Sequence, residues 1–236
     1  GNRRPGDGEA TVQALNVRSM ATLERLSDAV QREGWPQPQR SLRGDGWALA
    51  LPAVLALVDK LRHAGTPLGE YVQGQFFNGV KTGLNKAFVI NEATRERLVA
   101  EDPRSVGLIK PWLQGRDIDR WVVHWPRKYL LYVTWDCPIE CYPAIEAHLV
   151  RFREALERCD GVRNNGPCPW YALSRPRSES KWAFERPKIV YPDIAVEPEF
   201  AFDDMGAFGG NTIYVMPTDD MFLLGILNSK VTAFFH

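Results

Sequence analysis

QGQFFNGVKTGLNKAFVI, residues 73–90, constrains the fold of this chain more strongly than any other stretch. Three glycines interrupt it: Gly74, Gly79 and Gly83. Glycine accepts positive φ and lets other backbone segments come close, so the stretch predicts a tight turn and no helix. The turn presents four polar side chains, Lys81, Thr82, Asn85 and Lys86, before residues 87–90 enter a β-strand.

The same stretch lacks the pattern of a phosphate-binding loop. That loop has the spacing GxxxxGK[ST], in which the lysine and the hydroxyl residue follow the last glycine and a helix begins. Here Lys81 and Thr82 precede Gly83, and the predicted strand that follows offers no helix N-terminus to a phosphate. A nucleotide-binding site is therefore not expected at this turn.

Five motifs follow one another in a characteristic order. They are GVKTGLNKAFVIN (79–91), LIKPWLQGRDIDRW (108–121), RPKIVYPDI (186–194), GGNTIYVM (209–216) and LLGILNSK (223–230). Together they resemble the TaqI-like specificity domain, the target-recognition part of certain adenine-N6 DNA methyltransferases and fused type II restriction-modification enzymes. The resemblance extends from Leu49 to the C-terminus.

The resemblance implies that this chain reads double-stranded DNA for a methyltransferase domain upstream in the same protein. Enzymes of this kind use S-adenosylmethionine to methylate an adenine amino group, and they flip the base out of the duplex. The parent protein is thus expected to be a site-specific adenine-N6 DNA methyltransferase, with or without nuclease activity. The fragment itself is expected to hold no catalytic residue, cofactor or metal.

Length and composition indicate a folded chain with a sizeable core. Of its 236 residues, 44% are apolar, which suffices for one core or for one core with a small appendage. The longest apolar run, residues 47–58, is too short to cross a bilayer, and the N-terminus lacks a signal-peptide pattern. We therefore expect a cytoplasmic protein without a membrane partner.

The cysteines do not suggest a metal site. Cys137, Cys141, Cys159 and Cys168 match no common zinc-ligand spacing, and no histidine pair stands near them. Free thiols are therefore predicted.

The charges balance overall but are unevenly distributed. The formal net charge is zero, which argues against a protein that grips nucleic acid by bulk charge. Residues 104–130 nevertheless hold six basic residues, whereas residues 193–220 hold seven acids and no base. One surface can therefore face phosphate while another faces away.

The periodicity predicts short elements that do not alternate regularly. Helices are expected at residues 21–33, 52–64, 92–100, 143–159 and 218–228, and strands at 107–110, 129–134, 188–194, 200–203 and 212–216. Residues 206–210 are expected to form the bend of a hairpin. This mixture predicts an α+β fold, with mixed short-stranded sheets and flanking helices, rather than a doubly wound sheet.

We interpret the chain as two parts. Residues 1–46 are polar and rich in Gly, Pro and Arg, and are interpreted as a connector from a missing upstream catalytic domain. Residues 47–236 are interpreted as the target-recognition domain. Apolar residues continue to the last positions, so we expect this domain to be truncated at its C-terminus.

Two polar positions have ordinary structural interpretations. Asp117 lies beside Arg116 and Arg120, and such groups in turns usually fix the shape of the loop. His148 falls near the apolar face of the helix predicted at residues 143–159, with no partner at helical spacing. It is predicted to be packed rather than to bind a metal or relay a proton.

Residues 161–181 read as a long loop rich in side chains that can read bases. Arginine pairs with guanine and asparagine with adenine in the major groove, and we expect base contacts from Arg175 or Arg177. Trp170 and Tyr171 are predicted to anchor the loop on the core, with stacking against a nucleotide as the alternative. The alternative for the whole segment is a solvated, mobile loop without a role. The full set of candidate DNA-binding residues is Lys81, Thr82, Lys86, Arg116, Lys128, Arg163, Asn164, Asn165, Arg175, Arg177 and Lys181.

A DNA target-recognition domain is the function that these observations favour. A self-contained enzyme is disfavoured because the sequence lacks GxSxG, an Asn-Pro-Pro-Tyr type of motif and a glycine-rich cofactor loop. The alternative is a protein–protein interaction module that binds no nucleic acid, which the zero net charge would also suit. A cofactor loop and an Asn-Pro-Pro-Tyr motif upstream of Gly1 would distinguish the two.

Overall fold

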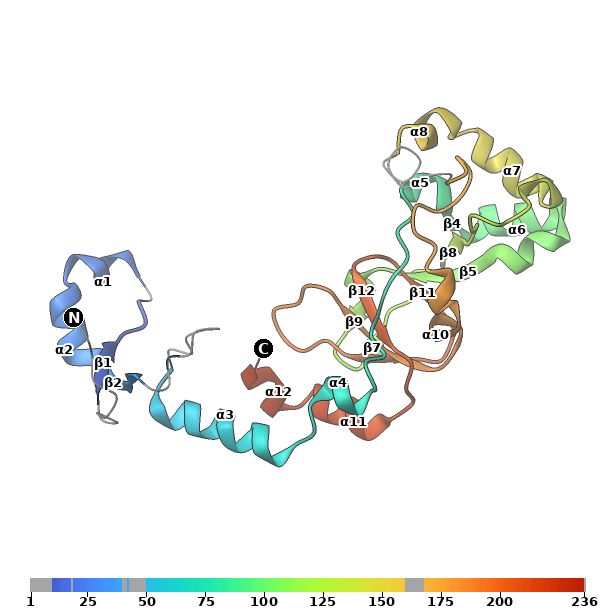
Figure 1. The fold of residues 1–236 in the computed structure, drawn as a ribbon. Coiled ribbons are helices and arrows are strands. Elements are labelled where there is room, and N and C mark those ends of the chain that lie inside the picture. Colours follow the sequence, from blue (N-terminus) through green and yellow to red (C-terminus); the bar gives the residue numbers. More distant parts are fainter. Residues whose placement is uncertain (1–9, 18, 40–41, 43–49, 160–167, 236) are drawn as a thin grey trace, which may run out of the picture. The chain divides into compact units, whose positions relative to one another are not determined.

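The computed structural model describes residues 10–17, 19–39, 42, 50–159 and 168–235 (Figure 1). The chain divides into two compact units, Gly1–Tyr71 and Val72–His236. Residues 52–64, which the sequence pattern groups with the recognition domain, fall in the first unit. No described helix is long and apolar enough to span a membrane.

The first unit contains a small sheet as well as helices. Strands β1 (Thr11–Ala14) and β2 (Trp35–Pro38) pair antiparallel, and α1 (Met20–Glu24) and α2 (Leu26–Glu33) lie between them in the sequence. The single helix predicted for residues 21–33 is wrong, because Arg25 leaves the helical region with φ −130° and ψ 45°. The polar composition of residues 1–46 does not reveal this sheet.

Two further helices complete the first unit, α3 (Pro52–Ala64) and α4 (Leu68–Tyr71). α3 has the predicted bounds, and Pro52 stands in its first turn. A backbone N–H in the first turn has no partner within the helix, so the N–H that proline lacks is not needed there.

In the described residues of the second unit, short strands form three small sheets. One sheet has the order β10-β9-β12-β3, another has the order β11-β5-β8-β4, and β6 pairs with β7. The strands are β3 (Phe77–Asn78), β4 (Val89–Asn91), β5 (Ile109–Leu113), β6 (Ile118–Asp119), β7 (Val122–Val123), β8 (Lys128–Leu131), β9 (Lys188–Pro192), β10 (Ala201–Asp203), β11 (Phe208–Gly209) and β12 (Ile213–Met216).

Helices flank these sheets, so the predicted α+β fold is confirmed. They are α5 (Asn85–Phe88), α6 (Glu92–Glu101), α7 (Pro143–Val150), α8 (Arg153–Glu157), α10 (Lys181–Glu185), α11 (Met221–Leu227) and α12 (Lys230–Phe235). Asn91 caps α6, since its side-chain oxygen accepts from the Thr94 N–H at 3.0 Å. Asp220 caps α11 in the same way.

Large buried side chains hold the second unit together. Among the described residues, the largest that are fully buried include Trp112 of β5, Phe88 of α5, Phe184 of α10 and Phe208 of β11. The rings of Phe184 and Phe208 stack with their centroids 5.1 Å apart. Burial of aromatic side chains is a main source of stability in a core, and here it joins elements from both four-stranded sheets and the helices.

Backbone segments from three of the motifs meet at β11. The Val80 N–H donates to Gly209 O (2.8 Å), and the Gly210 N–H donates to Leu113 O (2.9 Å). A Cβ on Gly79 would lie 2.0 Å from Gly210 O, so this approach requires glycine. The GVKTG, PWLQG and FGGN segments are thereby fixed against one another.

The glycine turn is confirmed, but its end differs from the prediction. Gly83 has φ +85°, and residues 85–88, expected to include a strand, form the single helical turn α5. The hydroxyl of Thr82 donates to Asn85 Oδ1 (2.6 Å) at the start of this turn. The prediction that no helix occurs in residues 73–90 is therefore wrong, and the strand β4 begins at Val89.

The helix predicted at residues 143–159 is two helices. α7 ends before Phe152, which has φ −112° and ψ 5°, and α8 follows it. The buried residues Ile145, Leu149 and Leu156 keep their spacing across the break. Apolar periodicity therefore predicts the buried face and cannot locate the interruption.

The hairpin predicted around residues 206–210 is also wrong. β9 lies between β10 and β12 in the sheet, and residues 208–209 form β11, which pairs in parallel with β5. The strand expected at residues 107–110 starts later, because the 3-10 helix η2 (Pro103–Leu108) comes first. Strand order depends on long-range pairing, which local turn signals do not encode.

Candidate nucleic-acid interface

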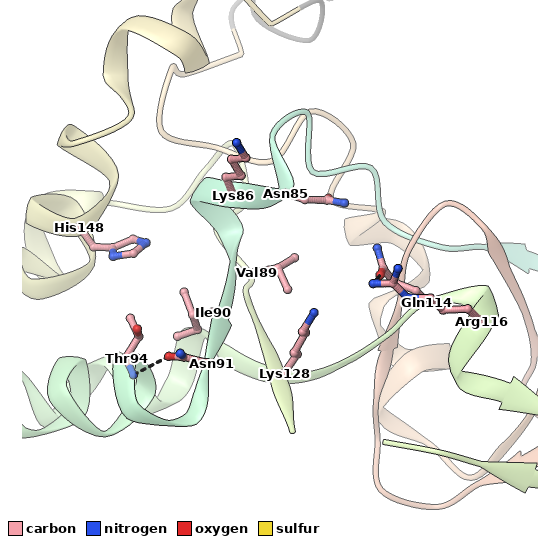
Figure 2. Close-up of a pocket in the computed structure, with 10 residues that line it drawn as sticks. All are labelled: Asn85, Lys86, Val89, Ile90, Asn91, Thr94, Gln114, Arg116, Lys128 and His148. Carbon is pink, nitrogen blue, oxygen red and sulfur yellow. Dashed lines mark hydrogen bonds between the residues drawn. The ribbon is translucent and has the colours of Figure 1, made fainter. Parts of the chain in front are cut away.

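A cleft in the second unit collects side chains from segments far apart in the sequence (Figure 2). Its volume is about 420 Å³. The lining residues are Asn85, Lys86, Val89, Ile90, Asn91, Thr94, Gln114, Arg116, Lys128 and His148. They belong to α5, β4, α6, β8, α7 and the 3-10 turn η3 (Gly115–Asp117) with the residue before it.

Three cations from the predicted set line this cleft. Lys86 and Arg116 are exposed, on α5 and η3, and Lys128 begins β8 directly opposite Asn91 of β4. Register partners in an antiparallel pair project from the same face, so Lys128 and Asn91 project together. None of the described lining residues is acidic, so the cleft is positively charged although the whole chain is neutral.

Three amide side chains give the cleft an excess of hydrogen-bond donors. Asn91 Oδ1 accepts from the Thr94 N–H (3.0 Å), and Gln114 Oε1 accepts from Arg116 Nη2 (2.8 Å). Asn85 Oδ1 accepts from the Thr82 hydroxyl. An amide has two N–H donors as well as its oxygen, so the cleft offers N–H groups and ammonium groups to a ligand that accepts hydrogen bonds. Phosphate oxygens are such acceptors.

The turn that carries Arg116 is held by its own side chains. Asp117 Oδ2 accepts from the Gln114 N–H at 2.8 Å, which closes η3. Asp117 therefore shapes this loop as predicted, but it does so through a backbone N–H and not through the expected pair with an arginine. Arg116 donates to Gln114 instead of to Asp117, and it forms no ion pair with a carboxylate among the residues that the structure describes.

His148 lines the cleft as a packed histidine, as predicted. It is 7% exposed, and its Nε2 is 3.0 Å from Ala87 O. Burial lowers the pKa of His148, and this effect exceeds the opposing effect of the bond to Ala87 O. The charges of Arg151 and Arg97 add smaller lowering effects. A histidine with a lowered pKa is neutral at neutral pH, so the positive charge of the cleft comes from its lysines and arginine.

A second basic group lies on the other side of the Gly83 turn. Lys81 and Arg175 are partners in an isolated antiparallel bridge, with N···O distances of 3.1 and 2.9 Å, and both are exposed. Arg177 is half-buried and donates to Asn78 Oδ1 at 3.4 Å. Arg175 and Arg177, the two arginines expected to read bases, therefore differ: the first is exposed and the second is half-buried.

The remaining candidates are less suited to DNA contact or lie outside the described residues. Thr82 is buried and holds α5. Lys181 forms an ion pair with Glu185 (3.6 Å), and its ammonium lies 5.8 Å from the ring centre of Tyr132. Arg163, Asn164 and Asn165 lie outside the described residues.

The two aromatics of the predicted loop anchor it on the core, as expected. Trp170 and Tyr171 pack against the core cluster, and the Tyr171 hydroxyl donates to Cys137 O at 3.3 Å. The guanidinium of Arg153 lies 4.8 Å from the ring centre of Trp170. Residues 178–180 and α10 turn the end of the predicted loop into helix.

A second hollow of about 560 Å³ adjoins the cleft and has the opposite charge. Gln114 and Arg116 line both. The other polar side chains of the hollow include three acids, Asp119, Asp193 and Glu199. The η3 turn therefore separates a basic from an acidic surface.

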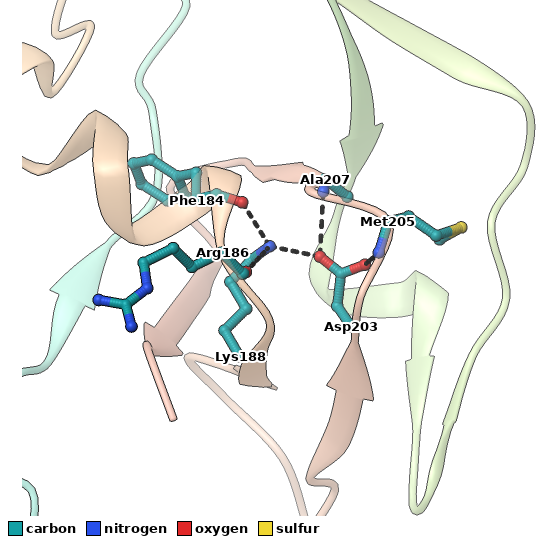
Figure 3. A network of polar contacts seen from close by, with 6 residues as sticks. All are labelled: Phe184, Arg186, Lys188, Asp203, Met205 and Ala207. Carbon is teal, nitrogen blue, oxygen red and sulfur yellow. Dashed lines mark hydrogen bonds and ion pairs between the residues drawn. The ribbon is translucent and has the colours of Figure 1, made fainter. Parts of the chain in front are cut away.

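A buried ion pair joins Lys188 of β9 to Asp203 of β10 (Figure 3), and it was not predicted from the sequence. Lys188 and Asp203 are both fully buried, and the ammonium also donates to Phe184 O (2.6 Å). Asp203 accepts further bonds from the Met205 and Ala207 N–H groups, each at 3.0 Å. Burial lowers the pKa of Lys188, and the Asp203 charge opposes that shift. The pair fastens β9 to β10 and is structural.

Comparison with known proteins identifies the family. Residues 110–236 match the TaqI-like C-terminal specificity domain, and because this match covers more than half of the chain, the chain belongs to that family. The predicted DNA-recognition (specificity) domain is therefore confirmed.

Two further proteins are similar to this chain. The type II methyltransferase M.BanIII of Aneurinibacillus aneurinilyticus is 28% identical over 178 residues, which span 67% of this chain and 29% of that protein. The chain thus covers less than a third of the length of this relative. The structure of the type IIL restriction-modification enzyme MmeI in complex with DNA aligns with a TM-score of 0.46 and 15% identity, over 66% of this chain and 20% of that one.

Proposed function

We propose that this chain supplies target recognition to a site-specific adenine-N6 DNA methyltransferase or a fused restriction-modification enzyme. Its partners are double-stranded DNA and a methyltransferase domain located upstream in the same protein. The family assignment and the likeness to a type II methyltransferase support this proposal. The parent enzyme would use S-adenosylmethionine, and this chain would bind the duplex while the catalytic domain acts on a flipped adenine.

The basic cleft is the observation that carries the proposal. Lys86, Arg116 and Lys128 come from three separate segments, yet they line one cavity without an acid among its described residues. DNA phosphates are bound by such clusters of lysine and arginine, and each contact releases counterions. The amide N–H donors add neutral contacts to phosphate oxygens, which position a protein on the duplex.

Binding of short duplexes by the chain, measured by fluorescence anisotropy across a salt series, tests the proposal. The chain should bind weakly and with little sequence preference, because the cleft contacts phosphates and the upstream domain is missing. Replacing Lys86, Arg116 and Lys128 together by Ala should reduce the slope of log affinity against log salt by about 2.7, that is about 0.9 per phosphate contact.

The matched control removes three positive charges elsewhere. Arg97, Arg153 and Arg158 each form an ion pair with a carboxylate four residues away, Glu101, Glu157 and Glu154 respectively. Replacing these three by Ala should leave the salt slope within about 0.5 of the unaltered chain, because surface charges that are already paired with a carboxylate release few counterions. Equal effects of the two triple variants, or no DNA binding at low salt, would favour a protein interaction module.

A further inference from the structure

We infer that the bridge between Lys81 and Arg175 is a second phosphate-binding point, in which both side chains hold one phosphodiester group of the DNA backbone. The inference rests on the proposed function, since it assumes that the chain binds DNA. It assigns Arg175 to the backbone, in contrast to the base contact that its sequence context predicts.

Hydrogen bonds hold the backbone at this bridge, and both side chains are exposed. Lys81 and Arg175 exchange two backbone hydrogen bonds, at 3.1 and 2.9 Å. Ser174 and Pro176, on either side of Arg175, are buried, and so is Val80. Paired residues of an antiparallel bridge project to the same face, so the ammonium and the guanidinium lie on one side of a fixed piece of backbone. Such pre-organisation favours binding.

The pair is electrostatically unfavourable without a ligand. Like charges directly opposite each other across two strands repel. Neither Lys81 nor Arg175 forms an ion pair with a carboxylate in the part of the chain that the structure describes. A group placed between them that carries a full negative charge would remove this repulsion.

The choice between phosphate and base follows from the charge. A guanine edge offers two acceptors to an arginine but is neutral overall, so it leaves the repulsion from Lys81 in place. A phosphodiester carries a full negative charge and accepts bonds from both side chains. Phosphate therefore suits the pair better than a base does.

Arg177 has a different role, as a positioning residue. It has φ +57°, an unusual conformation for a residue other than glycine, and begins η5 (Ser178–Ser180). Its Nη2 donates to Asn78 Oδ1, and its Nε is buried without a partner among the described residues. The side chain thus links the segment after Arg175 to β3, and it holds Arg175 in line with Lys81.

Charge-neutralising variants of the full 236-residue chain test the inference. Lys81→Gln and Arg175→Gln should each reduce the salt slope by about 0.9, and the double variant by about 1.8. Each single change should weaken binding by a factor of roughly five to ten at 0.1 M salt, equally for duplexes of unrelated sequence. The melting temperature should stay the same or rise, because a repulsion is removed.

Two matched variants accompany these measurements. Arg97→Gln removes one charge from an ion pair on α6 and should leave the salt slope unchanged. Arg177→Gln should lower the melting temperature, and its salt slope should change by less than that of Arg175→Gln, because Arg177 acts through the segment it holds.

The outcomes separate this inference from the proposed function. Suppose that the slope of log affinity against log salt is reduced in the Lys86, Arg116 and Lys128 triple variant but is unchanged in Lys81→Gln and Arg175→Gln. The bridge then does not contact DNA, and only the inference fails. If neither the wild-type chain nor any variant binds DNA at low salt, the inference and the proposed function both fail. If duplexes selected from a random pool by Arg175→Gln lose preference at a single base pair, Arg175 reads a base and the phosphate assignment is overturned.

Discussion

The two hollows on either side of the η3 turn have similar sizes and share Gln114 and Arg116, but their charges are opposite. The cleft adds Lys86 and Lys128 to Arg116, whereas the neighbouring hollow adds Asp119, Asp193 and Glu199. A chain with zero net charge thus has a basic and an acidic surface next to each other. A duplex that approaches the basic side meets an attractive field, and the acidic side repels it and so limits how the protein can orient.

Breaking the buried ion pair between Lys188 and Asp203 should have the largest effect on stability. Asp203→Ala leaves the Lys188 ammonium buried without its partner, so it should destabilise the chain by about 3–5 kcal/mol in urea unfolding. Asp204→Ala, at the exposed neighbouring position, should change stability by no more than about 0.5 kcal/mol.

The double variant Lys188→Met/Asp203→Leu tests the reason for that effect. It should recover part of the lost stability, because the isolated charge is gone and apolar side chains fill the space. If Asp203→Ala lowered the free energy of unfolding by less than about 1 kcal/mol, the ion pair would not be what holds β9 to β10.

The turn between the two basic groups should give the next largest effect. Gly83→Val places a β-branched residue at φ +85°, with its Cβ 3.3 Å from the Ser174 Cβ, and should cost about 1–3 kcal/mol. DNA binding should weaken as well, since Lys81 and Lys86 flank the turn. Gly107→Val is the control, because a Cβ at Gly107 has open space around it and no positive φ. Unchanged melting of Gly83→Val would contradict the structural role of the turn.

Single charge changes on the two sides of η3 should act in opposite directions. Arg116→Gln should weaken DNA binding by a factor of roughly five to ten at 0.1 M salt, through one lost phosphate contact. Asp193→Asn with Glu199→Gln should strengthen binding by a factor of about three at most, because exposed charges are screened over a Debye length of about 8–10 Å. Weaker binding after the acidic changes would place the acidic hollow in the interface.

The smallest effect concerns pH and the histidine of the cleft. The folded-state pKa of His148 lies below its ordinary value of 6.5, so the unfolded chain binds more protons in the window below pH 6.5. Stability should therefore be lost as pH falls through that window, and this contribution is fully present above it. His148→Gln should reduce the difference between unfolding free energies measured at pH 7.5 and 5.5. An identical pH dependence in both proteins would show that His148 does not contribute.

Local features of the chain were predictable because local hydrogen bonds and sterics produce them. The glycine turn, the Asn91 cap and the helix at Pro52–Ala64 each depend on a few neighbouring residues. The buried face of residues 143–159 follows from apolar spacing, although Phe152 breaks the helix. The split at Arg25 and the helical turn at α5 were missed because they depend on backbone angles at single residues.

The candidate site was predicted only in part from residue types. Lys86, Arg116 and Lys128 were named from the sequence as candidate DNA-binding residues, and the structure brings them to one cleft. The same set of candidates included Thr82, which is buried, and Lys181, which is paired with Glu185. Exposure and pairing depend on neighbours that are distant in the sequence.

The sequence by itself determined the family, the α+β class and the glycines that the backbone needs. Only the tertiary structure decided that Lys81 faces Arg175, that Lys188 is buried on Asp203, and that basic and acidic surfaces meet at Arg116. The physical reason is that strand order and the meeting of distant loops depend on burial of a shared core. That core is a property of the whole chain, whereas caps, turns and periodicity are properties of a few residues.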